Sequence, residues 1–131
     1  MSEENVETVR RAYECLNRRD VEGLLELCDD DFLMDMSERV FNPDTYRGHD
    51  GIRRFYEDVA DAWEIYRWDI EETRVSGDSV IAMLHCHGKG RQGPEVDWRV
   101  AWLWKFQGDT PSSLRFYRDR ADALEAAGLR E

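Results

Sequence analysis

The stretch YRGHDGIRRFYEDV, residues 46–59, decides the fold of this chain. Its apolar residues recur at steps of three and four, which predicts an amphipathic helix over residues 50–64. Gly48 allows the chain to turn before the helix, and His49 or Asp50 stands where a side chain can cap the first free N–H groups. We therefore interpret His49 and Asp50 as residues that start a helix, in preference to a catalytic pair.

Two shorter helices and one strand are predicted before this helix. Residues 4–17 carry apolar residues at helical spacing, and Asp20 can cap a second helix that follows them. Alternation begins in FLMDMS, residues 32–37, and indicates a first strand. The next stretch, ERVFNPDTY at residues 38–46, shows no period and is interpreted as a loop.

After residue 66 the apolar pattern changes period from about 3.6 residues to 2, which is typical of strands. Four strands are predicted, over residues 67–75, 79–90, 95–106 and 112–117, separated by turns that contain glycine or proline. Asp119 then caps a short final helix, which Gly128 ends at a left-handed position. We expect a single α+β domain over residues 1–131, because this length suits one hydrophobic core.

The composition excludes several classes of function. The net charge is -11, with 18 basic and 29 acidic residues, so the chain would repel phosphate backbones and no nucleic acid partner is expected. No apolar run approaches the ~20 residues of a membrane span, and the first residues lack an apolar signal region. Three cysteines without paired spacing argue against a disulfide framework. We expect a cytoplasmic protein without a membrane partner.

In this order and spacing, the predicted elements resemble the nuclear-transport-factor-2-like proteins, in which a curved antiparallel sheet wraps round a long helix to form a cone. The residues that carry the resemblance are YRGHDGIRRFYEDV, YRDRADALEAAGL at 117–129 and, in support, AYECLNRRDVEGLLELCDDDF at 12–32. The SnoaL-like branch, which includes polyketide cyclases, is the most similar. The resemblance implies a homodimer, and this fold hosts enzymes and binding modules alike. The sequence contains no glycine-rich phosphate loop and no metal-ligand spacing, so no cofactor is expected.

Strand parity predicts which residues line the cone. On VDWRVAWLWKF, residues 96–106, the tryptophans share one face, which we expect to be concave because three tryptophans in water would form a costly patch. They can stack on a planar ligand or simply fill the cone. Ala101 and Leu103 fall on the outer face and give weak support for a homodimer. The expected substrate-binding residues are Tyr13, Leu33, Trp63, Trp98, Val100, Trp102, Leu114 and Phe116.

The candidate general base is Asp35, and the resemblance carries this assignment. The stretch CDDDFLMDM, residues 28–36, is similar to the segment of the related ketosteroid isomerases that holds their catalytic aspartate. Placing Asp35 in the cavity puts Leu33 on the same face and sends the apolar Phe32, Met34 and Met36 the other way. A cavity of low dielectric would raise the pKa of Asp35 toward values useful to a base.

Two further catalytic residues are expected beside Asp35. The isomerases' pocket tyrosine on the long helix falls on Tyr56, a hydrogen-bond donor, and Arg118 is expected to face inward as electrostatic support. Two other donors of those isomerases are replaced, by Ala12 and Trp102, so steroid isomerisation by their mechanism is not expected.

The function implied is a cofactor-independent enzyme for a small apolar or aromatic carbonyl compound, performing isomerisation, cyclisation or (de)hydration. The alternatives are a non-catalytic binding module for the same kind of molecule and an assembly domain whose cavity is filled by its own tryptophans.

His85 and His87 share one face of a predicted strand, with Cys86 opposite. The pair is either a metal or proton-shuttle site or two histidines on the convex face of the sheet. No third ligand has a visible spacing, so no metal site is predicted.

Overall fold

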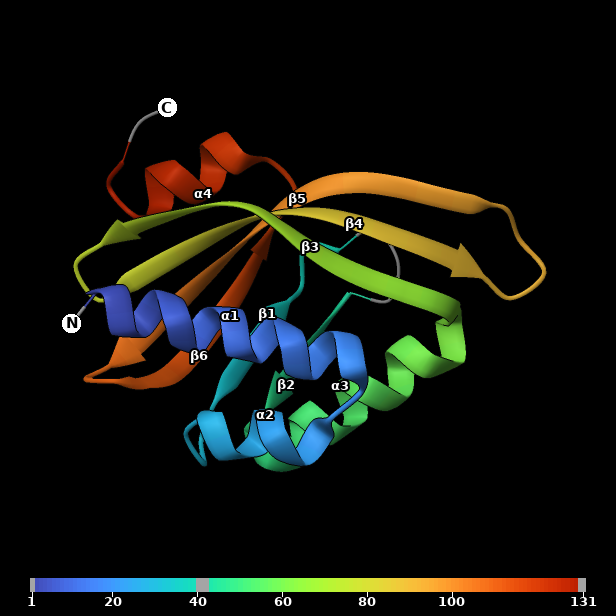
Figure 1. Ribbon diagram of the computed structural model, residues 1–131, viewed down its shortest axis with the longest axis horizontal. Helices are drawn as coiled ribbons and strands as arrows, with labels where there is room; N and C mark the ends of the chain where they lie inside the picture. The colour runs from blue at the N-terminus through green and yellow to red at the C-terminus, as the bar shows by residue number, and fades with distance from the viewer. Residues whose placement is uncertain (1, 40–42, 130–131) are drawn as a thin grey trace.

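The computed structural model describes residues 2–39 and 43–129 and contains one curved sheet with helices on both of its faces (Figure 1). The expected loop at 38–46 falls partly on residues 40–42, which lie outside the described residues. The elements, in chain order, are α1 (Ser2–Arg18), α2 (Val21–Leu27), β1 (Leu33–Met36), β2 (Asp44–Arg47), α3 (Gly48–Ala62), β3 (Trp63–Ser76), β4 (Ser79–Gly90), β5 (Glu95–Gln107), β6 (Thr110–Tyr117) and α4 (Arg120–Ala126).

The six strands lie in the order β2-β1-β6-β5-β4-β3, and the expected α+β cone is confirmed. Only β1 and β6 run parallel; every other neighbouring pair is antiparallel. The one element that the sequence pattern missed is β2, which pairs with β1 at the edge of the sheet. A strand of four residues is too short to show a reliable period, and ladder hydrogen bonds to β1 stabilise it instead.

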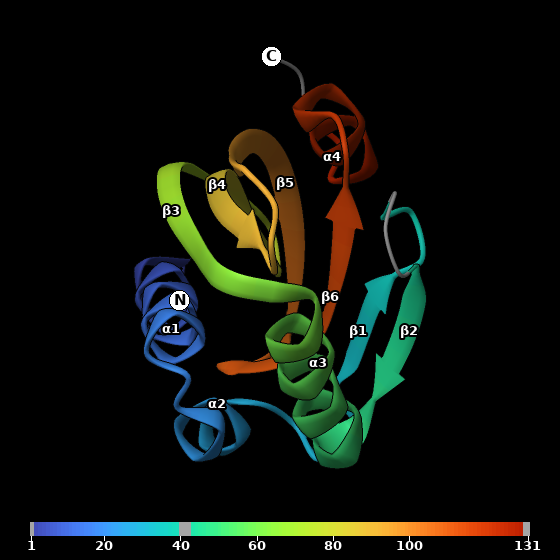
Figure 2. The same ribbon diagram turned by 90° about the vertical axis from the view of Figure 1, so that its right-hand side faces the viewer.

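The concave face of the sheet holds α1 and α3, whereas α4 lies on the opposite face (Figure 2). The long helix α3 buries Ile52, Phe55 and Val59 against the sheet. Gly51 allows close contact with β2, because a Cβ atom there would lie 2.8 Å from the backbone carbon of Tyr46. The main core of the protein therefore fills the space between α1, α3 and the inner face of the sheet.

The start of α3 differs in one respect from the expectation. Gly48 has a φ of +70°, as a turning glycine requires, and its N–H bonds to the carbonyl of Phe32 at 2.7 Å. The N-cap residue is Arg47, and among the described residues no side chain caps the helix. The expected capping by His49 or Asp50 is therefore wrong. His49 instead lies with Nε2 3.3 Å from the carbonyl of Cys28.

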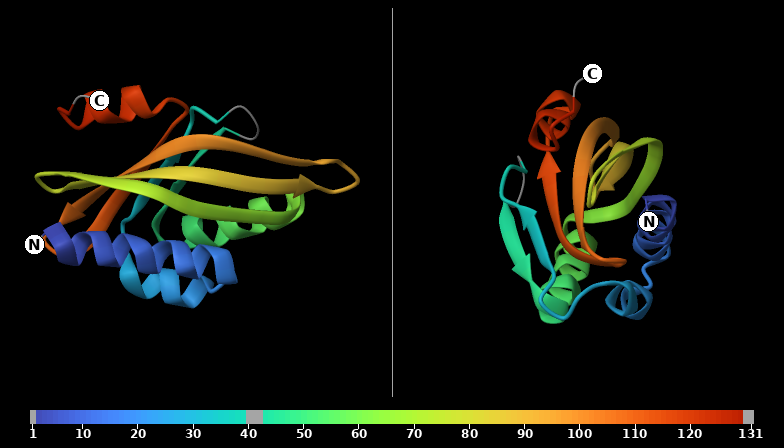
Figure 3. Two further views of the ribbon diagram at one scale, coloured as in Figure 1. Left: turned by 45° about the horizontal axis from the view of Figure 1, so that its top comes forward. Right: turned by 90° about the vertical axis from the view of Figure 1, so that its left-hand side faces the viewer.

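The convex face of the sheet carries a second, smaller core beneath α4. Ala123 and Leu124 of this helix pack on outward-facing residues of β4, β5 and β6, namely Ile81, Met83, Ala101, Leu103 and Tyr117. Ala101 and Leu103 are thus covered by the chain's own helix. The support that these two residues gave to a homodimer is withdrawn for that reason. Figure 3 shows that α4 spans only one part of this face.

Within the described residues, no helix is long and apolar enough to cross a membrane.

Candidate ligand-binding site

The inner face of β5 carries the aromatic residues that strand parity predicted. Trp102 and Trp104 are buried in the main core, and Trp98 packs against it while remaining partly exposed. Val100, Leu114 and Phe116 also lie in this core, as expected for residues on the concave face.

The deep part of the cone is filled by the protein's own rings. Nε1 of Trp104 donates a hydrogen bond to the hydroxyl of Tyr13 at 3.0 Å, and both side chains are buried. The ring of Tyr13 also lies 5.5 Å from that of Trp102, and Phe32 lies 6.0 Å from Trp104. Tyr13 was expected to bind substrate, but here it joins α1 to β5 as a core residue.

Toward the other end of the strands, the aromatic side chains become partly exposed. Trp63, Tyr66 and Trp98 form a group with ring centroids 5.3–5.6 Å apart. Gly88 makes room for two of them, since a Cβ atom at this position would lie 2.7 Å from Trp63 and 3.1 Å from Trp98. This partly exposed aromatic edge adjoins the buried Trp68, whose ring lies 4.3 Å from that of Tyr66.

The rings of Phe55, Trp68 and Trp102 form a buried aromatic wall, and two indole N–H groups in it have no hydrogen-bond partner within the described part of the chain. Nε1 of Trp68 and Nε1 of Trp102 are both shielded from solvent and find no acceptor among the described residues, and their rings lie 5.9 Å apart. Both rings lie 6.3 Å from that of Phe55 on α3. An unpaired buried N–H costs about 1–3 kcal/mol, so native proteins seldom keep one without a reason.

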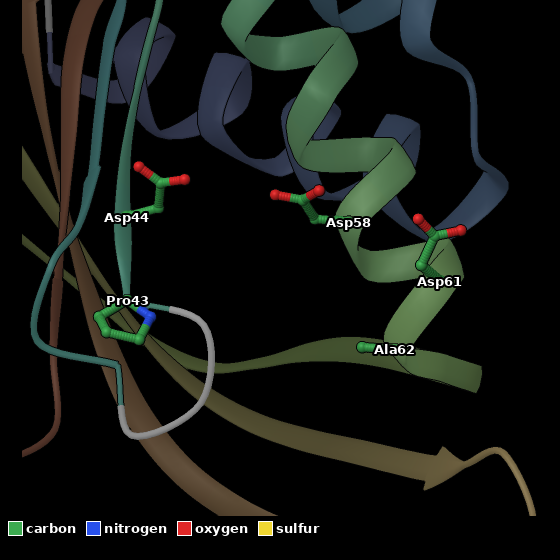
Figure 4. Close-up of a pocket in the computed structure, with 5 residues that line it drawn as sticks. All are labelled: Pro43, Asp44, Asp58, Asp61 and Ala62. Carbon is green, nitrogen blue, oxygen red and sulfur yellow. The ribbon is translucent and has the colours of Figure 1, made fainter.

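A pocket of about 480 Å³ opens between α3 and the start of β2 (Figure 4). Three carboxylates line it together with one apolar residue from each side: Asp44, Asp58, Asp61, Pro43 and Ala62. Ala62 of the pocket lining is the residue directly before Trp63 of the partly exposed aromatic edge.

A chain of hydrogen bonds leads from this pocket toward Phe55. The phenol of Tyr46 donates to Oδ2 of Asp58 at 2.6 Å and accepts from Nη2 of Arg39 at 3.1 Å. The guanidinium of Arg39 also lies 5.7 Å from the ring of Phe55. Burial, and then the bond to Asp58, raise the pKa of Tyr46 against the opposing effect of Arg39. The phenol therefore remains a donor at neutral pH.

Asp35 does not face the cavity, so the predicted orientation of β1 is wrong. Met34 and Met36 are buried in the main core, whereas Asp35 and Leu33 line a different pocket of about 340 Å³ on the convex side. Burial would raise the pKa of Asp35, but hydrogen bonds from Ser37 and the nearby Arg115 outweigh it, and the pKa is lowered. The apolar alternation was the correct guide here, because burying two methionines outweighs burying one carboxylate.

The other two expected catalytic residues also lie elsewhere. The hydroxyl of Tyr56 donates to the carbonyls of Cys15 and Asp20, at 3.2 and 3.3 Å, and so connects α3 to the turn between α1 and α2. Arg118 is exposed just beyond β6, and the arginine beside Asp35 is Arg115. The structure does not bring Asp35, Tyr56 and Arg118 together.

The residues that sequence reasoning missed are Arg39, Tyr46 and Asp58. The first two belong to the stretch that was interpreted as a loop, although Tyr46 also opens the stretch that identifies the fold. Asp58 stands on the polar side of α3, where a carboxylate is ordinarily solvated. Its proximity to Tyr46 depends on β2 running back alongside α3, which no local spacing reveals.

Comparisons with known proteins agree with this architecture. The SnoaL-like domain family matches the chain over residues 9–110, so the chain belongs to this family. A search of curated proteins finds no match. Among solved structures, a nuclear-transport-factor-2-like protein of unknown function from Burkholderia pseudomallei is similar over 93% of this chain and 95% of its own, with 22% identity and a TM-score of 0.79.

Two similar structures were solved with ligands. TerC, crystallised with polyporic acid, matches 95% of this chain and 98% of its own, with 20% identity and a TM-score of 0.79. Rv0760c from Mycobacterium tuberculosis, in complex with estradiol-17beta-hemisuccinate, matches 88% of this chain and 94% of its own, with 21% identity and a TM-score of 0.75. At these identities the likeness establishes the fold alone.

Proposed function

We propose that this chain binds a small, flat, mainly apolar compound that carries a carbonyl oxygen, within the aromatic wall of the cone. The observation that carries the proposal is the pair of unpaired indole N–H groups of Trp68 and Trp102. Each is a donor without an acceptor, set between aromatic faces that suit a planar ring. The ligand supplies the missing acceptor.

In this proposal the ligand reaches these groups past the partly exposed aromatic edge, which begins one residue after Ala62 of the 480 Å³ pocket. Trp63, Tyr66 and Trp98 are only partly buried, so they form the edge that shifts to admit the ligand, while Trp104 stays bonded to Tyr13. The ligands of the similar structures, a steroid ester and polyporic acid, are of the same general kind. Their binding supports the class of ligand, and the indole pair supports its position.

A matched pair of compounds tests this proposal: 2-acetylnaphthalene carries a carbonyl acceptor, and 2-ethylnaphthalene does not. The five tryptophans give five indole N–H signals in a nitrogen–proton correlation spectrum. We expect 2-acetylnaphthalene to bind more tightly and to shift the signals of Trp68 and Trp102 downfield. The signal of Trp104, already bonded to Tyr13, should move little. Equal affinity for both compounds, or no binding of either, would contradict the proposal.

A second function, acid/base catalysis on the bound compound, is favoured by the Tyr46–Asp58 pair at the pocket. Asp58 takes a proton from the carbon next to the carbonyl, while Tyr46 positions Asp58. The indole N–H groups of Trp68 and Trp102, which bind the carbonyl oxygen, hold the resulting oxyanion. This is the role expected of Asp35, transferred to Asp58, one of the three carboxylates that line the pocket. Isomerisation, aldol-type cyclisation and dehydration of a β-hydroxy carbonyl compound all begin with such a step, hydration ends with its reverse, and the step needs no cofactor.

Deuterium exchange tests the second function separately from binding. The methyl protons of 2-acetylnaphthalene, followed by proton NMR in D₂O, should exchange faster with the protein present. Asp58→Asn should abolish this acceleration without preventing binding, and Asp35→Asn should leave it intact. Acceleration that survives in Asp58→Asn would remove Asp58 from the mechanism.

A further inference from the structure

Along β4, the residues on the outer face of the sheet change from apolar to polar. Ile81 and Met83 are covered by α4, and the next two outward residues, His85 and His87, lie beyond the apolar cluster under that helix. Cys86 faces the main core, as do Val80, Ala82 and Leu84. The interpretation that the histidines lie on the convex face is therefore correct. Their rings are 4.2 Å apart.

Each histidine has a carboxylate beside it from a different neighbouring strand. Asp97 on β5 lies with Oδ2 3.7 Å from Nε2 of His85, and Asp69 on β3 lies with Oδ2 3.2 Å from Nε2 of His87. The register of the strands explains this arrangement. His87 is paired with Asp97 and His85 with Asp69, so each histidine contacts the carboxylate that lies diagonally across from it. Strands β3, β4 and β5 lie side by side in the sheet (Figure 3). Together they present two imidazoles between two carboxylates.

The ligand atoms are close enough for one metal ion. His85, His87 and Asp97 each offer one ligand atom, and these atoms all lie within 4.8 Å of one another. In a tetrahedral zinc site, ligands about 2.0–2.2 Å from the metal are roughly 3.4 Å apart. A contraction of that size is within reach of side-chain rotation, since Asp97 is an exposed side chain.

The burial of Nε2 of His85 and its missing hydrogen bond also favour a metal site. This nitrogen is shielded from solvent and makes no hydrogen bond among the described residues, since Asp97 at 3.7 Å is beyond hydrogen-bond distance, so a ligating nitrogen is present with its lone pair or N–H unsatisfied. The nearby arginines do not occupy the site: Arg67 is paired with Oδ1 of Asp69, and Arg99 with Glu71. A carboxylate behind a metal-bound histidine commonly orients the ring through the nitrogen that does not bind the metal. Asp69, 3.2 Å from Nε2 of His87, is placed to do this, which assigns the metal to Nδ1 of that ring.

We propose that His85, His87 and Asp97 form a binding site for a divalent transition metal of the zinc type, with Asp69 orienting His87. Two imidazoles and one carboxylate suit zinc, copper or nickel better than magnesium or calcium, which prefer oxygen ligands alone. The site lies on the convex face, opposite the aromatic wall, so it does not depend on the proposed function. No metal site was predicted from the sequence, because Asp97 reaches the histidines only through the register of β4 and β5.

Zinc titration of the protein without a histidine tag tests the proposal, by calorimetry and by NMR of the imidazole nitrogens. The chain has three histidines, and His49 provides the matched control. We expect binding of one zinc ion per chain, with shifts of the His85 and His87 ring nitrogens and none at His49. His87→Ala and Asp97→Asn should each weaken zinc binding by more than about tenfold, and His49→Ala should not.

Circular dichroism would check that the variants remain folded, which we expect because Asp97 is exposed and His87 is about half-exposed. No zinc binding near equimolar concentration would overturn the proposal. So would binding that survives in His87→Ala or that shifts the ring of His49.

Discussion

The hydroxyl of Tyr46 donates a 2.6 Å hydrogen bond to Oδ2 of Asp58, and this bond connects β2 to α3 beside the 480 Å³ pocket that Asp58 lines. The same hydroxyl accepts from Arg39, so one phenol holds a cation and an anion in place. The Tyr46 ring is buried, so the position of its hydroxyl is fixed by packing and the bond holds Asp58 in one orientation at the pocket.

We expect Tyr46→Phe to lower the free energy of unfolding by about 1–3 kcal/mol, since it leaves both Asp58 and Arg39 without the hydroxyl. Tyr117→Phe is the matched control, because Tyr117 is also buried but its hydroxyl makes no hydrogen bond among the described residues. Urea unfolding of both variants provides the measurement. Equal stability of the two would show that the Tyr46–Asp58 bond contributes nothing to folding.

The pH dependence of Asp35 follows from its lowered pKa. Although burial acts to raise it, bonds from Ser37 and the charge of Arg115 hold the folded-state value below the ordinary ~3.9 of an aspartate. The carboxylate therefore stabilises the fold above that ordinary pKa, and its contribution is lost as the pH falls through the folded-state value.

Asp35→Asn should be less stable than the wild type at pH 7, and the difference should vanish as the pH falls well below ~4. Asp31→Asn, at an exposed position, controls for the loss of one negative charge. Chemical denaturation across the pH range measures both. A difference that grows toward acid pH would mean that the pKa of Asp35 is raised, as in the original assignment to the cavity.

Trp104 and Trp102 allow a comparison of how much a hydrogen-bonded indole and an unbonded one contribute to the free energy of unfolding. Both are buried on the same face of β5, but only Trp104 donates a hydrogen bond, to Tyr13. Replacing either by phenylalanine removes a similar ring volume. We expect Trp104→Phe to cost about 1 kcal/mol more than Trp102→Phe in thermal or urea unfolding. A larger cost for Trp102→Phe would indicate that its N–H already has a partner.

The sequence predicted an element correctly wherever its apolar residues followed a clear helix or strand period. The alternation on β5 correctly placed Trp102 inside and Leu103 outside, and helical spacing located α3 to within two residues at each end. It failed where a likeness to relatives was preferred to alternation, as at Asp35. It also could not reveal pairs such as Tyr46 with Asp58, because such pairs depend on how distant segments are registered.

The aromatic edge of the cone depends on Gly88, which has no side chain to keep Trp63 and Trp98 apart. A Cβ atom there would lie 2.7 Å from the Trp63 ring and 3.1 Å from the Trp98 ring, so Gly88→Ala must displace at least one indole. We expect lower stability, a changed tryptophan emission spectrum and weaker binding of 2-acetylnaphthalene. Gly93→Ala is the control, since a Cβ atom at that position meets nothing closer than 3.7 Å. Unchanged emission and binding in Gly88→Ala would mean that Trp63 and Trp98 do not form the edge that admits the ligand.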